Sequence, residues 1–152
     1  MTQKGIPPIK RGMGVFILQQ KGGVTLKQIT KEMLKIYKPT SGLDWMNYKL
    51  VRKEMTFHHI IKKADGGYEC IENGALLMPI PHQYLHVIEG KHWKTYKHLN
   101  DMFRIINDQR HEPTKEQREI IEEILSEFEL KHIKDRTSKG KILIKSEYLK
   151  RG

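Results

Sequence analysis

The chain has 152 residues, of which 38% are hydrophobic and 30% are charged, as expected for a single domain with a modest core. No apolar run approaches the roughly 20 residues of a membrane-spanning helix, and the first residues contain no apolar signal core. We therefore expect no membrane segment and a cytoplasmic protein. The single cysteine, Cys70, excludes an internal disulfide and a cysteine-based zinc ribbon.

The formal net charge of +10 is distributed unevenly. Residues 1–63 contain 13 Lys and Arg against 3 Asp and Glu, and residues 131–152 contain 8 against 2. Residues 64–130 are acidic, with 7 against 13. Basic ends around an acidic middle favour a polyanionic partner such as nucleic acid, although a solvated lysine-rich surface gives the same composition.

Residues 1–23 combine several glycines with basic residues, which predicts an irregular, basic N-terminal segment. A helix is predicted from Thr25, because Thr25 and Gln28 have the spacing of a capping box and apolar residues follow at helical period. Pro39 ends this helix, since the residue before a proline disfavours the helical conformation.

A loop is predicted next, over residues 40–54, with Trp45 and Tyr48 as packing anchors. The segments that follow predict two short strands separated by a glycine turn: residues 55–61, the turn at 65–67, and residues 75–78.

Three helices are predicted in the second half of the chain. The first begins at Pro81 and stops at Gly90, the second covers about residues 92–108, and the third is capped by Thr114 and Gln117. The apolar stripes of the second and third helices predict buried faces. In the second helix the stripe comprises Trp93, Tyr96, Leu99, Phe103 and Ile106. In the third helix it comprises Ile120, Ile121, Ile124, Leu125 and Phe128.

These elements predict a small α+β protein. Its single domain covers residues 24–130 and lies between the N-terminal segment and a basic C-terminal tail, residues 131–152. The tail contains one apolar stretch, Ile142 to Ile144, which predicts a strand.

Histidines are concentrated in one region, since four of the eight lie between residues 58 and 86. His82 and His86 are four residues apart and project from one helical face, where they could chelate one divalent ion at about 2.1 Å if a third ligand arrived. His58 and His59 are neighbours on a strand and point to opposite faces. One of them can then act as a ligand while the other faces the reacting group, an arrangement suited to metal-assisted phosphodiester hydrolysis.

The segment Phe57-His58-His59-Ile60-Ile61, followed by Gly66-Gly67, Glu72-Asn73-Gly74-Ala75-Leu76-Leu77 and His82, resembles the ββα-metal motif of the HNH endonucleases. In that family an Asp or His precedes the catalytic His, an Asn lies in the intervening segment, and a later His lies on the helix. The resemblance covers about residues 55–90. With His86 added, the ligand set resembles that of the nuclease colicins, and the flanks resemble small phage and prophage HNH proteins of bacterial hosts.

By position, the resemblance implies that His58, His82 and His86 bind the metal and that His59 is the general base. Asn73 joins the catalytic set as the motif asparagine that holds the loop of that histidine. The implied fold is a ββα-metal hairpin-plus-helix core packed among amphipathic helices. The implied cofactor is one divalent ion (Zn, Ni, Mn or Mg), and a histidine at position 58 instead of an aspartate shifts binding away from Mg. No organic cofactor is implied.

Each of these residues also has a simpler interpretation. The His82–His86 spacing arises by chance on surface helices, and Asn73-Gly74 is a common hairpin turn. The pair Gly66-Gly67 favours a turn over a phosphate cradle. Four basic residues near the motif would contact DNA or simply be solvated: Lys62, Lys63, Arg52 and Lys53. The other four histidines are expected to be surface or packing residues: His92, His98, His111 and His132.

The sequence therefore predicts a metal-dependent endonuclease that hydrolyses phosphodiester bonds in DNA by a one-metal, histidine general-base mechanism. Two alternatives remain open. One is a nuclease acting on RNA, and the other is a non-catalytic nucleic-acid-binding or metal-stabilised module that retains the motif.

Overall fold

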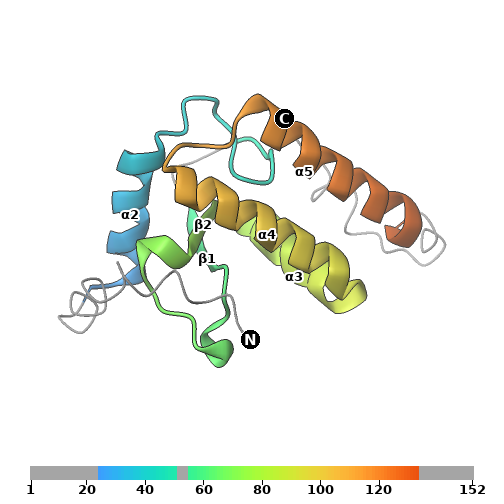
Figure 1. The fold of residues 1–152 in the computed structure, drawn as a ribbon, viewed down its shortest axis with the longest axis horizontal. Coiled ribbons are helices and arrows are strands. Elements are labelled where there is room, and N and C mark those ends of the chain that lie inside the picture. Colours follow the sequence, from blue (N-terminus) through green and yellow to red (C-terminus); the bar gives the residue numbers. More distant parts are fainter. Residues whose placement is uncertain (1–23, 51–54, 134–152) are drawn as a thin grey trace.

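The computed structural model describes residues 24–50 and 55–133. This part contains four α-helices and a two-stranded antiparallel hairpin, which confirms the predicted α+β class (Figure 1). The elements in chain order are α2 (Leu26–Tyr37), β1 (Thr56–His59), η2 (Lys63–Asp65), η3 (Ile71–Asn73), β2 (Gly74–Leu77), α3 (Pro79–Lys91), α4 (Trp93–Gln109), α5 (Lys115–Phe128) and η4 (Glu129–Ile133). The predictions for residues 1–23 and for Ile142 to Ile144 lie outside the described residues. No helix in the described ranges is long and apolar enough to cross a bilayer.

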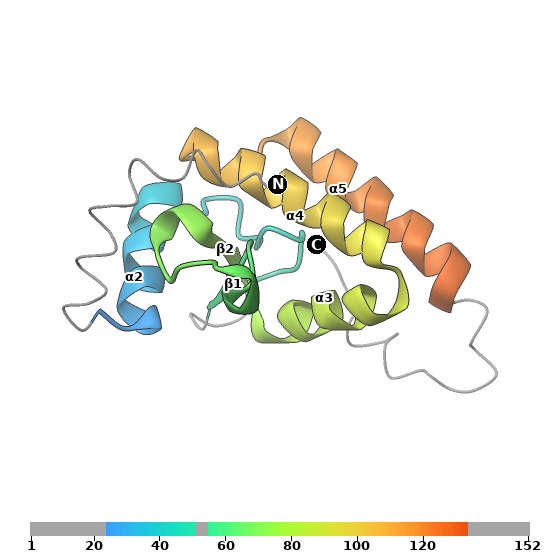
Figure 2. The ribbon, with the colours of Figure 1, turned by 60° about the horizontal axis from the view of Figure 1, so that its bottom comes forward.

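Helix α4 is the central element of the fold. It packs against α3 on one side and α5 on the other, and it also contacts β2 and η3 (Figure 2). Helix α2 packs on β1 and η3. The hairpin is therefore enclosed between α2 and the α3–α4 pair, and one face of β1 is turned toward the two helices.

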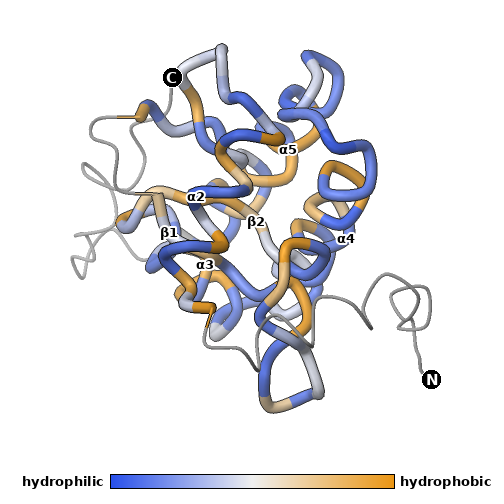
Figure 3. Tube along the Cα trace, turned by 90° about the vertical axis from the view of Figure 1, so that its left-hand side faces the viewer, coloured by the Kyte–Doolittle hydropathy of each residue, from blue (hydrophilic) through white to orange (hydrophobic). Residues whose placement is uncertain are grey.

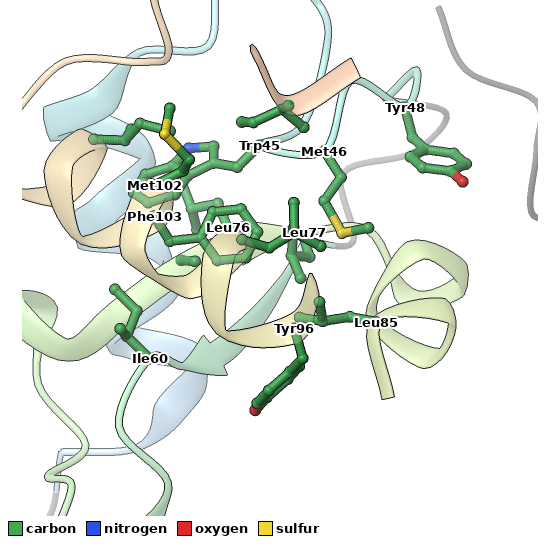
Figure 4. Packing of buried hydrophobic residues seen from close by; sticks show 14 of the residues in the cluster. Trp45, Met46, Tyr48, Ile60, Leu76, Leu77, Leu85, Tyr96, Met102 and Phe103 are labelled. Atoms are coloured by element: carbon green, nitrogen blue, oxygen red, sulfur yellow. The ribbon is translucent and has the colours of Figure 1, made fainter. Parts of the chain in front are cut away.

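The buried core joins the loop after α2 to the hairpin and to α4 (Figure 4). Trp45 is 1% exposed, and its ring meets that of Tyr37 edge-on at 5.2 Å. Tyr48 is also buried, so both predicted loop anchors are confirmed. Hydrophobic and hydrophilic residues alternate along α4 and α5, as their helical period requires (Figure 3).

The predicted helices are present, with small differences at their ends. Both capping boxes form, at Thr25 and at Thr114. Helix α3 begins at Pro79, two residues before the predicted Pro81. Both prolines fit there, because the N–H groups of the first helical turn have no partner within the helix. His92 ends α3 and is also the N-cap of α4, so no linker separates the two helices.

Two residues of the predicted stripes are not buried. Trp93 is 59% exposed and Ile120 is 40% exposed, so their assignment to the core was wrong. Each residue of an α-helix is turned about 100° from the next. Trp93 and Ile120 lie at the edges of their stripes and reach solvent, whereas the other members of both stripes are buried.

Strand β1 is shorter than the predicted 55–61. It pairs with β2 from Thr56 opposite Leu77 to His59 opposite Gly74. The ladder ends there because the Asn73 side chain takes the place of a strand partner: its Oδ1 accepts the Ile61 N–H at 2.8 Å, and its Nδ2 donates to the Ile61 carbonyl at 2.9 Å.

A buried carboxylate fixes the start of α3. Asp44 Oδ2 accepts the N–H of Met78, the N-cap residue of α3, at 2.9 Å. Asp44 Oδ1 accepts the N–H groups of Met46 and Tyr48 at 2.8 and 2.9 Å. The loop after α2 is therefore closed on itself and attached to the helix that carries His82 and His86.

Candidate metal centre

Three of the predicted site residues lie together between β1 and α3. His58, His82 and His86 each place one ring nitrogen within 4.8 Å of the others. The rings of His82 and His86 stack with centroids 5.2 Å apart, as expected one helical turn apart, and the His58 ring meets that of His82 edge-on at 5.3 Å. These histidines are close enough to bind a metal ion.

The hydrogen bond of His58 fixes which of its nitrogens can bind a metal. His58 is 2% exposed, and its Nε2 lies 2.8 Å from Asn100 Oδ1 on α4. An amide oxygen only accepts, so Nε2 carries the hydrogen. His58 Nδ1 is then the nitrogen with a lone pair, and it is available as a ligand.

The two helical histidines are fixed in the same way. Thr56 donates its hydroxyl hydrogen to the Leu77 carbonyl at 2.8 Å, so its oxygen accepts from His82 Nδ1, also at 2.8 Å. His86 Nδ1 donates to Glu89 Oε1 at 3.1 Å. In both rings the hydrogen lies on Nδ1, which leaves Nε2 as the potential ligand.

This donor set fits a divalent transition metal. Tetrahedral coordination with bonds of about 2.1 Å separates the ligand nitrogens by about 3.4 Å, a spacing within the span of the cluster. Three imidazoles suit Zn or Ni, whereas Mg and Mn prefer oxygen ligands. No fourth Asp, Glu, Cys or His joins the cluster within the described residues. His86, with its side chain 51% exposed, leaves one side open to solvent.

Burial keeps the inner histidines neutral. Desolvation lowers the pKa of His58 from 6.5 to about 3, although its hydrogen bond to Asn100 opposes the shift. Desolvation, followed by the nearby His86 and His59, lowers the pKa of His82 to about 4. Neutral imidazole is the form that binds a metal.

His59 points to the opposite face of β1, as the strand geometry predicts. Its ring meets Phe57 edge-on at 4.9 Å, and its Nε2 lies 3.7 Å from Glu69 Oε2, which is longer than a hydrogen bond. This Nε2 is buried and has no hydrogen-bond partner among the residues that the structure describes. Desolvation lowers the pKa of His59, and the nearby Glu69 opposes that shift.

Asn73 holds the chain just beyond His59. Besides its two bonds to Ile61, its Nδ2 donates to the Tyr68 carbonyl at 3.0 Å. Both amide hydrogens and the amide oxygen are therefore occupied, and the residue is 3% exposed. Asn73-Gly74 does not form a hairpin turn, because residues 60–73 connect the strands. Asn73 therefore fixes the backbone at Ile61, two residues beyond His59.

Gly67 makes this arrangement possible. A Cβ atom there would lie 1.8 Å from the Ile61 carbonyl oxygen and 2.8 Å from Asn73 Nδ2. The neighbouring Gly66 has a φ of 92°, which favours glycine. The glycine pair is thus a turn, as predicted, and its second residue allows the backbone to lie against Asn73.

The lysines predicted to contact DNA have carboxylate partners. Lys62 is hydrogen-bonded to Glu89, and Lys63 Nζ lies 3.0 Å from Glu69 Oε2. Glu89 therefore serves both Lys62 and His86, and Glu69 lies beside both Lys63 and His59. Arg52 and Lys53 lie outside the described residues.

Sequence reasoning missed the residues that orient the histidines. Glu89 follows its partner His86 by three residues on one helix, a spacing visible in the sequence. Thr56, the partner of His82, precedes His58 by two residues and so shares its strand face, which was also detectable. Asn100 lies 42 residues from His58. Its only signal is a polar residue within the apolar stripe of α4. Searches of protein-family models, curated proteins and solved structures give no match for this chain.

Proposed function

We propose that the protein is a metal-dependent endonuclease of the HNH type, in which strands β1 and β2 and helix α3 form the ββα-metal core. The observation that carries this proposal is the division of roles between neighbouring residues. His58 joins His82 and His86 on one face of β1, and His59 lies on the other face, with its Nε2 3.7 Å from the Glu69 carboxylate.

The residues around His59 support its role as general base. With the Glu69 carboxylate 3.7 Å from Nε2, the neutral ring favours its hydrogen on that atom, which leaves Nδ1 to accept a proton from water. Asn73 holds the Ile61 backbone and so limits movement of the strand end that carries His59. The lowered pKa keeps His59 unprotonated near neutral pH.

The three ligand histidines supply the other half of the mechanism. Asn100, Thr56 and Glu89 orient their rings before any ion arrives. A divalent ion bound there would polarise the scissile phosphodiester and stabilise the leaving oxygen. The exposure of His86 provides the side from which a phosphate can approach. Three protein ligands with an open position are typical of catalytic rather than structural zinc sites.

The basic balance of the chain supports DNA as the substrate, since a net charge of +10 favours binding of a polyanion. The direct test is conversion of supercoiled plasmid to nicked or linear forms with added Zn²⁺, Ni²⁺, Mn²⁺ or Mg²⁺, and with a chelator. We expect cleavage that the chelator abolishes and that His59→Ala removes. DNA binding without cleavage under any of these metals would instead favour the non-catalytic module, and cleavage confined to RNA would change the substrate.

A further inference from the structure

A second site lies at the other side of α4, away from the histidine cluster. The end of α5 lies beside the corner between α3 and α4 (Figure 2). Residues of α4, α5 and η4 line a pocket of about 200 Å³ there. Phe128 and Ile124 contribute apolar surface. The polar side chains around them are mostly basic: His92, Lys94, His98, Lys131 and His132, with Glu127 as the only acidic one.

The two pocket lysines differ from those beside the metal cluster. Neither Lys94 nor Lys131 has an ion-pair partner within the described residues, whereas Lys62 and Lys63 each have a carboxylate. Glu127 lines the same pocket and is paired with neither lysine. The two ammonium groups at this pocket outnumber its one carboxylate, and this excess of positive charge attracts an anion and disfavours a cation.

The imidazoles make the pocket suitable for an oxyanion. The His132 ring stacks on Phe128 at 4.8 Å and lies 5.1 Å from the His92 ring, so both rings are held at the pocket. His92 is held further by its Nδ1, which lies 2.8 Å from Thr95 Oγ1. Imidazole and ammonium N–H groups are donors to phosphate oxygens.

We propose that this pocket binds a phosphate group and that nucleic acid supplies it. The volume accommodates one phosphate with part of a sugar. The chain continues from the pocket into residues 131–152, where 8 Lys and Arg face only 2 Asp and Glu. This excess of positive charge in the sequence favours a polyanion as the source of the phosphate. The pocket itself does not depend on the proposed nuclease function; only the source of the phosphate rests on it.

The first test titrates the metal-free full-length protein with inorganic phosphate and follows amide and imidazole NMR signals. We expect saturable shifts at Thr95 and His98 that exceed those at His86. The double variant Lys94→Gln/Lys131→Gln should bind phosphate about tenfold more weakly, since it removes two charge-assisted contacts. Lys97→Gln/Lys115→Gln is the matched control, because these lysines, on α4 and at the start of α5, pair with carboxylates and do not line the pocket.

A second arm identifies the source of the phosphate by measuring the affinity for a short DNA duplex at several salt concentrations. The pocket variant should reduce the slope of log affinity against log salt by about one, as expected for one lost phosphate contact, and the control should not. Phosphate binding with an unchanged DNA slope would overturn nucleic acid as the source. Shifts that do not saturate, or an equal loss in both variants, would overturn the pocket as a phosphate site. Plasmid cleavage plays no part in either measurement, so failure of the nuclease proposal remains distinguishable.

Discussion

Asn100 Oδ1 accepts the Nε2 hydrogen of His58 at 2.8 Å, and both side chains are buried. Strand β1 and helix α4 thus share one polar contact inside an apolar core. The contact holds His58 in the tautomer that leaves the lone pair on Nδ1, so a residue on α4 determines which nitrogen β1 can offer as a ligand.

Replacing Asn100 should therefore weaken metal binding without removing a ligand. We expect Asn100→Ala to reduce the affinity for Zn²⁺ by about 10- to 100-fold, the usual effect of losing the partner of a ligand histidine. Competition with a chromophoric chelator measures it. Asp101→Ala is the control at the neighbouring exposed position, whose side chain pairs with Lys97. Equal affinities in the two variants would show that Asn100 does not orient His58.

Single histidine variants should separate ligands from the base. His58→Ala and His82→Ala should lose both metal affinity and cleavage, and His86→Ala should be milder because His86 is the most exposed of the three. His59→Ala should keep the metal but lower cleavage by about 10²- to 10⁴-fold, the usual contribution of a positioned base. Exposed His111→Ala is the control. Retention of metal by His58→Ala together with its loss in His59→Ala would reverse the two roles.

Glu89 contacts both His86 and Lys62, so its replacement should have opposite effects on Zn²⁺ binding and on DNA binding. Glu89→Gln removes the carboxylate that orients His86 and should weaken Zn²⁺ binding by about tenfold. The same change releases Lys62 and removes a negative charge, so metal-free protein should bind DNA more tightly at low salt. Metal competition and fluorescence anisotropy measure the two effects. Changes in the same direction would contradict the shared role of Glu89.

The buried histidines should make the metal-free protein acid-sensitive. The folded-state pKa values of His58 and His82, about 3 and about 4, lie below the unfolded value of 6.5. As pH falls from about 6.5 toward 4, the unfolded chain binds protons that the folded protein excludes, and the free energy of unfolding decreases. The slope should approach about 1.4 kcal/mol per pH unit for each excluded proton. Urea unfolding at several pH values measures it, and His58→Gln should reduce the slope.

Gly67→Ala should disturb the catalytic side of the site more than the ligand side. The added Cβ would collide with the Ile61 carbonyl and with Asn73, so the loop after His59 must shift. We expect a loss of cleavage with metal affinity nearly retained, because the atoms nearest to the added Cβ belong to Ile61 and Asn73 and not to the three clustered histidines. Gly90→Ala is the control, since a Cβ there meets nothing within 4 Å. Metal loss equal to the loss of cleavage would contradict this separation.

The sequence was sufficient for the local features and insufficient for the long-range ones. Capping boxes, the helical spacing of His82 and His86, and the alternation of His58 and His59 are set within a few residues, and the structure agrees with them. The Asp44–Met78 and His58–Asn100 contacts join residues 34 and 42 positions apart. No periodicity in the sequence encodes such distances. The exposure of Trp93 also depends on long-range packing. A residue at the edge of an apolar stripe is buried only if a neighbouring helix covers it, and the sequence of its own helix does not show this.

The shared residue His92, which ends α3 and begins α4, constrains how the length of this chain can vary. With no linker at the corner, a residue inserted between His86 and Asn100 has no loop to absorb it. An insertion within a helix turns everything beyond it by about 100° and shifts it by about 1.5 Å. The two helical histidines would then no longer meet the strand histidine that Asn100 orients. Exposed residues between His86 and Asn100 can therefore be substituted, but the number of residues in this stretch cannot change without disrupting the site.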